Sequence, residues 1–221
     1  MLLIASVELT FLLLAQIRSS LSMDAHLEIF KTYLQKKVAI TDEQFNLIAD
    51  HLKVKSFEKN EMILMKGDVS SQGFFVSTGL LRSYSIDSKG KTHIIQFAPE
   101  QWWLSERNGL LFNEPSDYFI DSVEATKAVI MTKDFMNEAA KHVPCMNDLN
   151  NNMLNNSIRF MQKRINMLLS ATAEERYLNF ITLYPNLTLR VPQWMIASYL
   201  GITPESLSRV RKDLAHKHFR T

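Results

Sequence analysis

Apolar residues recur every three or four positions between Asp24 and Leu52. The positions are Ile29, Phe30, Tyr33 and Leu34, followed by Phe45, Ile48, Ala49 and Leu52. This spacing puts the apolar side chains on one face of a helix, and the sequence Thr41-Asp42-Glu43 is typical of a helix start. The segment therefore predicts two short helices.

From Val54 to Thr132 the pattern changes to short runs of β-forming residues separated by turn residues. The runs are Met62–Met65, Gly73–Ser77, Gly79–Ile86, Thr92–Phe97, Tyr118–Val123 and Lys127–Met131. Turn sequences such as Lys66-Gly67-Asp68 and Asp87–Lys91 separate some of them. Short strands at roughly 8 to 12 residue spacing predict an antiparallel barrel or sandwich whose interior could be a pocket.

After Pro144 a helical pattern extends from Cys145 to about Ser170. It carries Leu154, Ile158, Met161, Ile165 and Leu168 at spacings of 4, 3, 4 and 3. A second apolar stripe, on an adjoining face, comprises Met146, Leu149, Met153, Phe160 and Met167. Two apolar faces predict that the helix packs on its own domain and on its copy in a homodimer. A buried helix in a monomer is the alternative.

The C-terminal part begins with an amphipathic helix over Thr172–Tyr184, followed by an expected short strand over Thr188–Val191. Val191–Leu214 then has the pattern of two helices joined by a tight turn. The first helix has an apolar face that includes the small residue Ala197, and Gly201 can adopt the positive φ of a corner. Thr203 is an N-cap with Pro204 at the first helical position, so a second helix begins there. This order predicts a helix-turn-helix.

The face of the second helix opposite its apolar residues is polar. It comprises Thr203, Glu205, Ser206, Ser208, Arg209 and Lys212. Glutamate can accept from cytosine N4, arginine can donate to guanine O6 and N7, and serine, threonine and lysine can hold phosphates. An unrelated helical hairpin would explain the apolar residues but not this face, so the six residues are the candidate DNA contacts.

Charge is unevenly distributed along the chain. The net charge of +2 comes from 25 basic and 23 acidic residues. From Thr188 onward there are six basic and two acidic residues, and the rest holds 19 basic and 21 acidic. A basic end on a slightly acidic body fits one module that contacts a polyanion.

Several function classes find no support. The single cysteine, Cys145, can form no internal disulfide, and six scattered histidines give no metal-binding spacing, so we expect no metal and no cofactor. No nucleophile and base pair is evident, and Glu106 with Asp117 is a weak carboxylate pair, so we expect no catalytic residues and no enzyme. The composition suits a cytoplasmic protein.

The chain divides into four expected parts. Residues 1–22 are interpreted as an apolar extension that is not native, because Met23 precedes a regular helix pattern; the run Leu9–Ile17 is too short to span a membrane. A sensor domain is expected over 23–144, a dimerisation helix over 145–170 and a DNA-binding domain over 171–221.

The sequence from about Met23 to Leu214 resembles the family of the catabolite activator protein and the fumarate and nitrate reduction regulator (Crp/Fnr). The stretch Phe74–Gly79 looks like the strand and glycine signature of that family, and Glu205 and Arg209 fall on its base-reading positions. The other base-reading arginine is replaced by Pro204, which implies a different operator. The resemblance implies an α+β fold with a cyclic-nucleotide-binding-like β-roll, flanking helices, a long dimerisation helix and a winged-type helix-turn-helix. Only His216–Thr221 would remain for the wing, which is therefore truncated.

Members of this family that bind a cyclic nucleotide carry Gly-Glu and, about ten residues later, an arginine that binds the cyclic phosphate. Ser105-Glu106 and Ser116-Asp117-Tyr118 stand at those positions here. The arginine is absent and Asp117 would repel an anion, so the resemblance implies that cyclic AMP does not bind. Glu106, Ser116 and Asp117 remain candidates for another small-molecule effector, and a packed core without a ligand is the alternative.

Three further features bear on this site. Trp102 and Trp103 could line such a pocket, but a core role fits them better. The iron–sulfur branch of the family is excluded by the single cysteine, and a haem would have only His93 as an unsupported ligand.

Together these observations predict a homodimeric transcription regulator that binds a pseudo-palindromic site in double-stranded DNA. The resemblance adds RNA polymerase as a partner and no membrane. The alternative is a ligand-binding module that acts through a protein partner without binding DNA.

Overall fold

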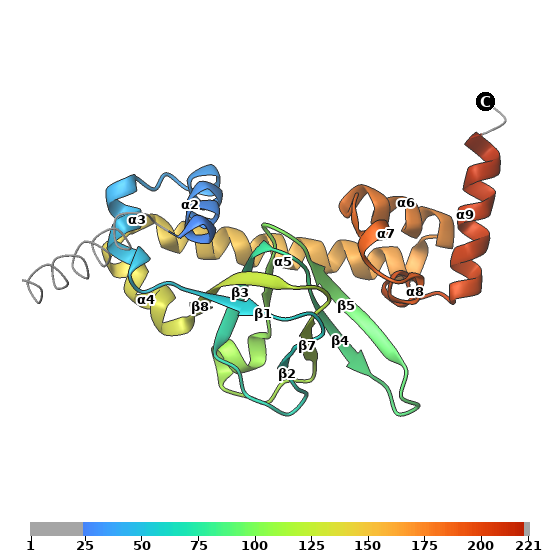
Figure 1. Cartoon of the computed structure of the whole chain (residues 1–221), viewed down its shortest axis with the longest axis horizontal. Helices are drawn as coiled ribbons and strands as arrows, with labels where there is room; N and C mark the ends of the chain where they lie inside the picture. Colours follow the sequence, from blue (N-terminus) through green and yellow to red (C-terminus); the bar gives the residue numbers. More distant parts are fainter. Residues whose placement is uncertain (1–23, 219–221) are drawn as a thin grey trace, which may run out of the picture.

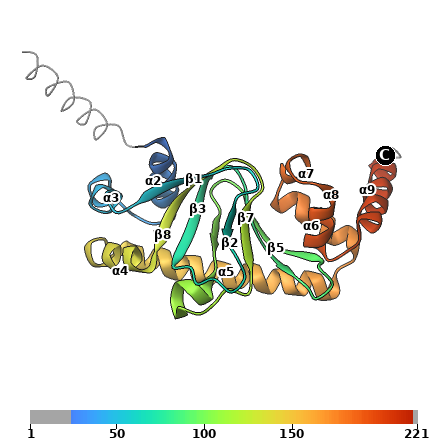
Figure 2. The same cartoon turned by 60° about the horizontal axis from the view of Figure 1, so that its bottom comes forward.

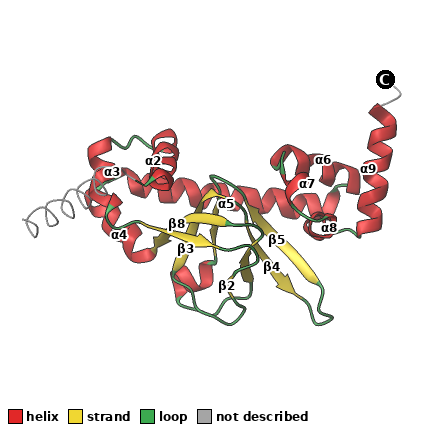
Figure 3. Cartoon of the chain, in the orientation of Figure 1, coloured by secondary structure: helices red, strands yellow, loops and turns green. Residues whose placement is uncertain are grey.

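The computed structural model describes residues 24–218 as an α+β molecule with a central strand region between two groups of helices (Figures 1 and 3). The expected extension over residues 1–22 lies outside the described residues. The helices are α2 (Ala25–Lys37), α3 (Asp42–Ala49), α4 (Lys133–His142), α5 (Cys145–Ser170), α6 (Ala173–Leu183), α7 (Leu187–Arg190), α8 (Gln193–Leu200) and α9 (Pro204–His218), with a π-helical turn, η1, over Asn108–Phe112. The strands are β1 (Lys53–Phe57), β2 (Met62–Leu64), β3 (Gln72–Thr78), β4 (Leu81–Ile86), β5 (Thr92–Ala98), β6 (Trp103–Ser105), β7 (Phe119–Ser122) and β8 (Thr126–Thr132).

The eight strands form two antiparallel four-stranded sheets, which confirms the predicted antiparallel architecture. One sheet has the order β1-β8-β3-β6 and the other the order β2-β7-β4-β5. Phe74, Leu81 and Ile120 are among the fully buried residues that fill the space between the sheets. Strand β5 lies at an edge of its sheet, so one row of its backbone groups has no strand partner.

The two N-terminal helices form as the sequence predicts. Asp24 caps α2 by accepting from the backbone N–H of His26, and Thr41 and Gln44 form a reciprocal capping box at α3. The buried faces of both helices pack with α4 and the start of α5 against one side of the roll. This end of the molecule is therefore a separate helical layer.

Helix α5 has 26 residues and runs along the whole roll toward the C-terminal helices (Figures 1 and 2). Its two predicted apolar stripes behave differently. Met146 and Leu149 are buried, and Phe160 contacts the ring of Trp102 with centroids 5.9 Å apart. The other stripe, Leu154, Ile158, Met161, Ile165 and Leu168, remains 36% to 56% exposed. One apolar face of α5 is thus left open in a single copy of the chain.

The C-terminal helices share one hydrophobic core with the outer face of the β4–β5 sheet. Phe97 of β5 lies at its centre, with ring centroids 6.1 Å from Tyr184 and 5.6 Å from Tyr199. Burial raises the pKa of the Tyr184 hydroxyl well above its ordinary value, and that hydroxyl donates to the carbonyl of Phe97 over 3.3 Å. The roll and the C-terminal helices are therefore packed as one body.

The expected strand over Thr188–Val191 is wrong, because Leu187–Arg190 forms the short helix α7. In a strand, Leu187, Leu189 and Val191 would share one face. Leu187 and Val191 are buried, whereas Leu189 is 90% exposed. A helical turn, closed by the backbone N–H of Val191 on the carbonyl of Leu187, separates them in this way.

Replacing Phe97 by alanine removes a fully buried ring from the joint core. We expect a loss of about 3–5 kcal/mol in the free energy of unfolding, measured in urea, with one cooperative transition. The matched variant Phe112→Ala removes a ring that is 66% exposed and should cost less than about 0.5 kcal/mol. Equal losses for the two variants would contradict the joint core.

Candidate nucleic-acid interface

The turn between α8 and α9 is fixed by its backbone. Gly201 has a φ of +67°, in the left-handed region that favours glycine. The N–H of Ile202 donates to the carbonyl of Ala197 over 3.0 Å, and the Thr203 hydroxyl accepts from the N–H of Ser206 over 3.2 Å. These bonds close α8 and start α9, so the two helices and their turn have the predicted helix-turn-helix form.

Helix α9 has one packed face and one open face. Leu207 is buried and Val210 and Leu214 are half-buried against the joint core. At 100° per residue, Glu205, Ser208, Arg209 and Lys212 share the opposite side, and all four are exposed. Across the described residues, the side chains of Arg209 and Lys212 have no hydrogen bond and no ion pair. The structure thus brings together four of the six predicted contact residues.

The other two predicted contacts, Thr203 and Ser206, form the N-cap of α9. Their hydroxyl oxygens lie 3.2 Å apart, and Ser206 is half-buried. The backbone N–H of Glu205 itself and the Thr203 side chain lower the pKa of the Glu205 carboxyl. Glu205 is therefore an anionic acceptor at neutral pH, whereas Arg209 and Lys212 only donate.

Helix α9 continues to His218, beyond Leu214 where the sequence pattern ends. His216 and Lys217 were expected to follow the recognition helix, but they are part of it. The Lys217 ammonium reaches back to Glu174 of α6 over 2.7 Å. The part expected as a truncated wing is thus helical as far as the structure describes it.

Polar groups of α5 and α8 cover the free edge of β5. The Ser198 hydroxyl donates to the carbonyl of Thr92 over 2.8 Å and accepts from the N–H of Ile94 over 2.9 Å. Arg164 of α5 donates over 3.0 Å to the carbonyls of both Ile94 and Tyr199. One guanidinium therefore joins α5, β5 and α8, and the sequence pattern assigned no role to Arg164.

A second bridge links the C-terminal helices to the roll through Arg190. Its guanidinium donates to Glu100 over 2.9 Å, to the carbonyl of Gly79 over 3.0 Å and to the Glu124 carboxylate. Burial alone would raise the pKa of the Glu100 carboxyl, but hydrogen bonds from Arg190 and the Gly79 N–H outweigh it and lower the pKa. The bridge is therefore an ion pair at neutral pH.

The three candidate effector residues lie in different surroundings. Glu106 is buried and accepts from the N–H groups of Asn108 and Gly109 over 3.1 and 2.7 Å. A Cβ at Gly109 would lie 2.5 Å from the carbonyl oxygen of Ser70, so η1 is pressed against that loop. The carboxylate of Glu106 thus holds the start of η1.

Ser116 and Asp117 differ in their surroundings. Ser116 is buried, and its hydroxyl donates to the carbonyl of Tyr118 over 2.9 Å. Asp117 is exposed. The two residues belong to one turn, and Ser116 serves that turn.

Both tryptophans are packed against other aromatic side chains. Trp103 donates its indole N–H to the Tyr33 hydroxyl over 2.9 Å and lies 5.2 Å from the Phe75 ring. Trp102 lies 5.0 Å from the Tyr184 ring. Their core role is confirmed.

Two classes of site lack support in residues 24–218. No helix there combines the length and apolar character needed to cross a membrane. No group of three or more histidine, cysteine or acidic side chains in the same range could hold a metal ion.

The variant Arg190→Met removes the bridge and should lower the free energy of unfolding near pH 7. The loss should be only about 1–2 kcal/mol, because solvent partly screens the bridge. The Glu100 pKa is lowered from its ordinary 4.5 in the folded protein. The carboxylate therefore adds to the free energy of unfolding above that pH, and this contribution is lost as the pH falls through the lower folded-state pKa. The difference between wild type and variant should therefore shrink in urea titrations carried from about pH 7 to about pH 3.

The control is Lys141→Met, which breaks the exposed pair with Glu138 and should leave stability unchanged. A difference between wild type and Arg190→Met that does not vary with pH would contradict the ionic bridge.

The comparisons with known proteins agree with this architecture. Residues 54–142 match the family model of the cyclic nucleotide-binding domain. The chain is similar to FixK2 from Bradyrhizobium japonicum, with a TM-score of 0.66 and 22% identity over 76% of this chain and 86% of that one. No curated protein matches the sequence.

Two Thermus thermophilus structures are also similar. A transcriptional regulator of the CRP/FNR family has a TM-score of 0.58 and 16% identity over 75% of this chain and 87% of its own. The catabolite activator protein has a TM-score of 0.51 and 17% identity over 81% of this chain and 85% of its own. Residues 54–142 therefore match the cyclic nucleotide-binding domain, and the chain shares over about three quarters of its length the fold of FixK2 and of the CRP/FNR family regulator.

Proposed function

We propose that this chain is a homodimeric transcription regulator, and not an enzyme, that binds a pseudo-palindromic DNA site. The observation that carries the proposal is the open face of α9, where Arg209 and Lys212 have no partner within residues 24–218. Helix α9 lies at the far end of the molecule from α2 and α3 (Figure 1), so a DNA duplex could approach it without displacing another element. The shared fold with a CRP/FNR regulator supports this function.

Each exposed group on α9 suits one kind of DNA contact. The Arg209 guanidinium can donate two parallel hydrogen bonds to guanine, and the Glu205 carboxylate can accept from cytosine N4. We assign phosphate or secondary contacts to Lys212 and Ser208. Thr203 and Ser206 keep the start of α9 in place. The backbone N–H groups at this helix N-terminus can also donate to a phosphate.

The open stripe of α5 supports the homodimer. Five apolar residues at heptad spacing stay exposed in one copy, and a second α5 packed along them would bury all five. Two copies related by a twofold axis present two α9 helices to successive major grooves, about 34 Å apart. The dimer therefore implies a DNA site with twofold symmetry.

We assign no cyclic AMP site to the roll. Glu106 already accepts from two backbone N–H groups, and no arginine stands beside Ser116 and Asp117 in the sequence. An effector of another kind at this place would have to displace those bonds. We place the protein in the cytoplasm, where the bound dimer would act on RNA polymerase.

The variants Arg209→Ala and Lys212→Ala separate base reading from phosphate binding. Arg209→Ala should cost about 1–3 kcal/mol on the selected DNA site and relax the preference at one base pair. Lys212→Ala should weaken binding to specific and random duplexes alike and reduce the salt dependence. Fluorescence anisotropy on both duplexes measures these effects, and equal losses for both variants on both duplexes would contradict the division.

The variant Ile158→Glu places a charge in the middle of the exposed α5 stripe, so it should convert a dimer into a monomer. Sedimentation velocity at micromolar concentration measures the change. The control Leu47→Glu alters a residue of α3 that is 61% exposed and should leave the dimer intact. A monomeric wild type, or a dimer that survives Ile158→Glu, would contradict the α5 interface.

A further inference from the structure

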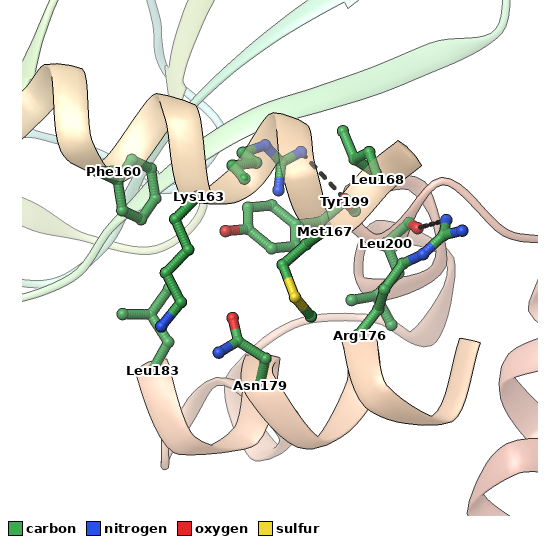
Figure 4. A pocket seen from close by; sticks show the side chains of 10 residues that line it. Phe160, Lys163, Met167, Leu168, Arg176, Asn179, Leu183, Tyr199 and Leu200 are labelled. Atoms are coloured by element: carbon green, nitrogen blue, oxygen red, sulfur yellow. Dashed lines mark hydrogen bonds between the residues drawn. The ribbon is translucent and has the colours of Figure 1, made fainter. Parts of the chain in front are cut away.

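A cavity of about 70 Å³ lies where the last turns of α5 meet α6 and α8 (Figure 4). It is separate from Glu106 and Ser116, the candidate effector residues of the roll, because none of its lining residues belongs to a strand or to η1. At about 10–15 Å³ for each water centre, this volume admits about five to seven waters, which corresponds to a ligand of several heavy atoms. The cavity is thus large enough for a small molecule.

The charged side chains around the cavity are all basic. Lys163 and Arg164 come from α5 and Arg176 from α6, and no aspartate or glutamate lines it. The acidic residues at the start of α6 are engaged elsewhere. Glu174 pairs with Lys217 over 2.7 Å, and Glu175 accepts from Thr172 over 2.8 Å. No carboxylate therefore faces these basic groups. The two arginines contact backbone carbonyls, and the ammonium of Lys163 is left to attract an anion.

Two of the three cations are held rigidly. Arg164 donates to the carbonyls of Ile94 and Tyr199, and Arg176 donates to those of Ala171 and Leu200, each over 3.0 Å. Each of these bonds uses only some of the five N–H groups of a guanidinium. The arginines are thus fixed in position while retaining further donors.

Lys163 and Asn179 supply donors of a different kind. They project toward one another from the facing helices α5 and α6 (Figure 4). Within the part of the chain that the structure describes, neither side chain makes a hydrogen bond or an ion pair. An ammonium and an amide on opposite walls can both donate to one carboxylate.

The remaining walls are apolar. Phe160 and Met167 contribute from α5 and Leu183 from α6, and Met167 extends between the two helices in Figure 4. A ligand that fits both kinds of wall has a charged end and an apolar body. Inorganic phosphate has the charge but lacks that body.

We propose that this cavity is a binding site for a small organic carboxylate, with Lys163 and Asn179 as the groups that bind its charge. Because its walls come from α5 on one side and from α6 and α8 on the other, an occupant would favour one angle between them. The effect of this angle on how α9 meets DNA rests on the proposed function, but the binding of the carboxylate does not.

The test uses the full chain without DNA, so its failure is distinguishable from failure of the proposed function. Benzoate, hexanoate, benzamide and inorganic phosphate are titrated separately at millimolar concentration and followed by ligand-observed NMR and calorimetry. We expect benzoate or hexanoate to bind about tenfold more tightly than benzamide and phosphate. No binding by either carboxylate, or equal binding by benzamide or phosphate, overturns the proposal.

The variants locate the site. Lys163→Met should weaken carboxylate binding about tenfold, and its exposed position predicts normal folding, which circular dichroism checks. Asn179→Leu should weaken it less, because an amide carries no charge. The matched control Lys59→Met removes an exposed lysine of the β1–β2 turn that does not line the cavity, and it should bind like wild type. Equal affinity of wild type and Lys163→Met would overturn the assignment.

Discussion

The edge of strand β5 is the constraint on which the rest of the structure depends. An edge strand exposes backbone groups that must find partners, and a large aromatic residue on its outer face must be covered. Ser198 and Arg164 satisfy the backbone groups, and Tyr184 and Tyr199 cover Phe97. The helix-turn-helix is therefore held by a core that it shares with the outer face of the roll.

This docking decides how α9 is presented. Helix α8 is fixed to β5, and the turn at Gly201 sets the angle at which α9 leaves it. Arg164 ties the same strand to α5, whose exposed apolar stripe forms the proposed dimer contact. A change in the docking would therefore alter the separation of the two α9 helices in a dimer. Arg164 also lines the basic cavity between α5 and α6.

The sequence predicts those parts of the structure that depend on local spacing. The bounds of α5, the two helices around Gly201 and the antiparallel strands all follow from periodicity, capping and turn residues. The face of α9 follows for the same reason. The pattern does not distinguish β1, whose residues are mostly exposed and include two lysines, or β6, which has only three residues.

The contacts that join the parts could not be predicted in this way. Ser198 and Ile94 are 104 positions apart, Arg190 and Gly79 are 111 apart, and Arg164 and Ile94 are 70 apart. A basic residue such as Arg190 has the same local pattern whether it faces solvent, DNA or a buried carboxylate. Only the tertiary packing separates Arg190, which bridges two parts of the chain, from Arg209, which remains open.

The central claim is that two α9 helices read a symmetric DNA site. The most direct measurement is selection of duplexes from a random pool by the full chain at about 150 mM salt, where non-specific binding is weak. We expect enrichment of one twofold-symmetric site with half-site centres about 10 base pairs apart. Recovery of a pool with no enriched sequence would contradict it.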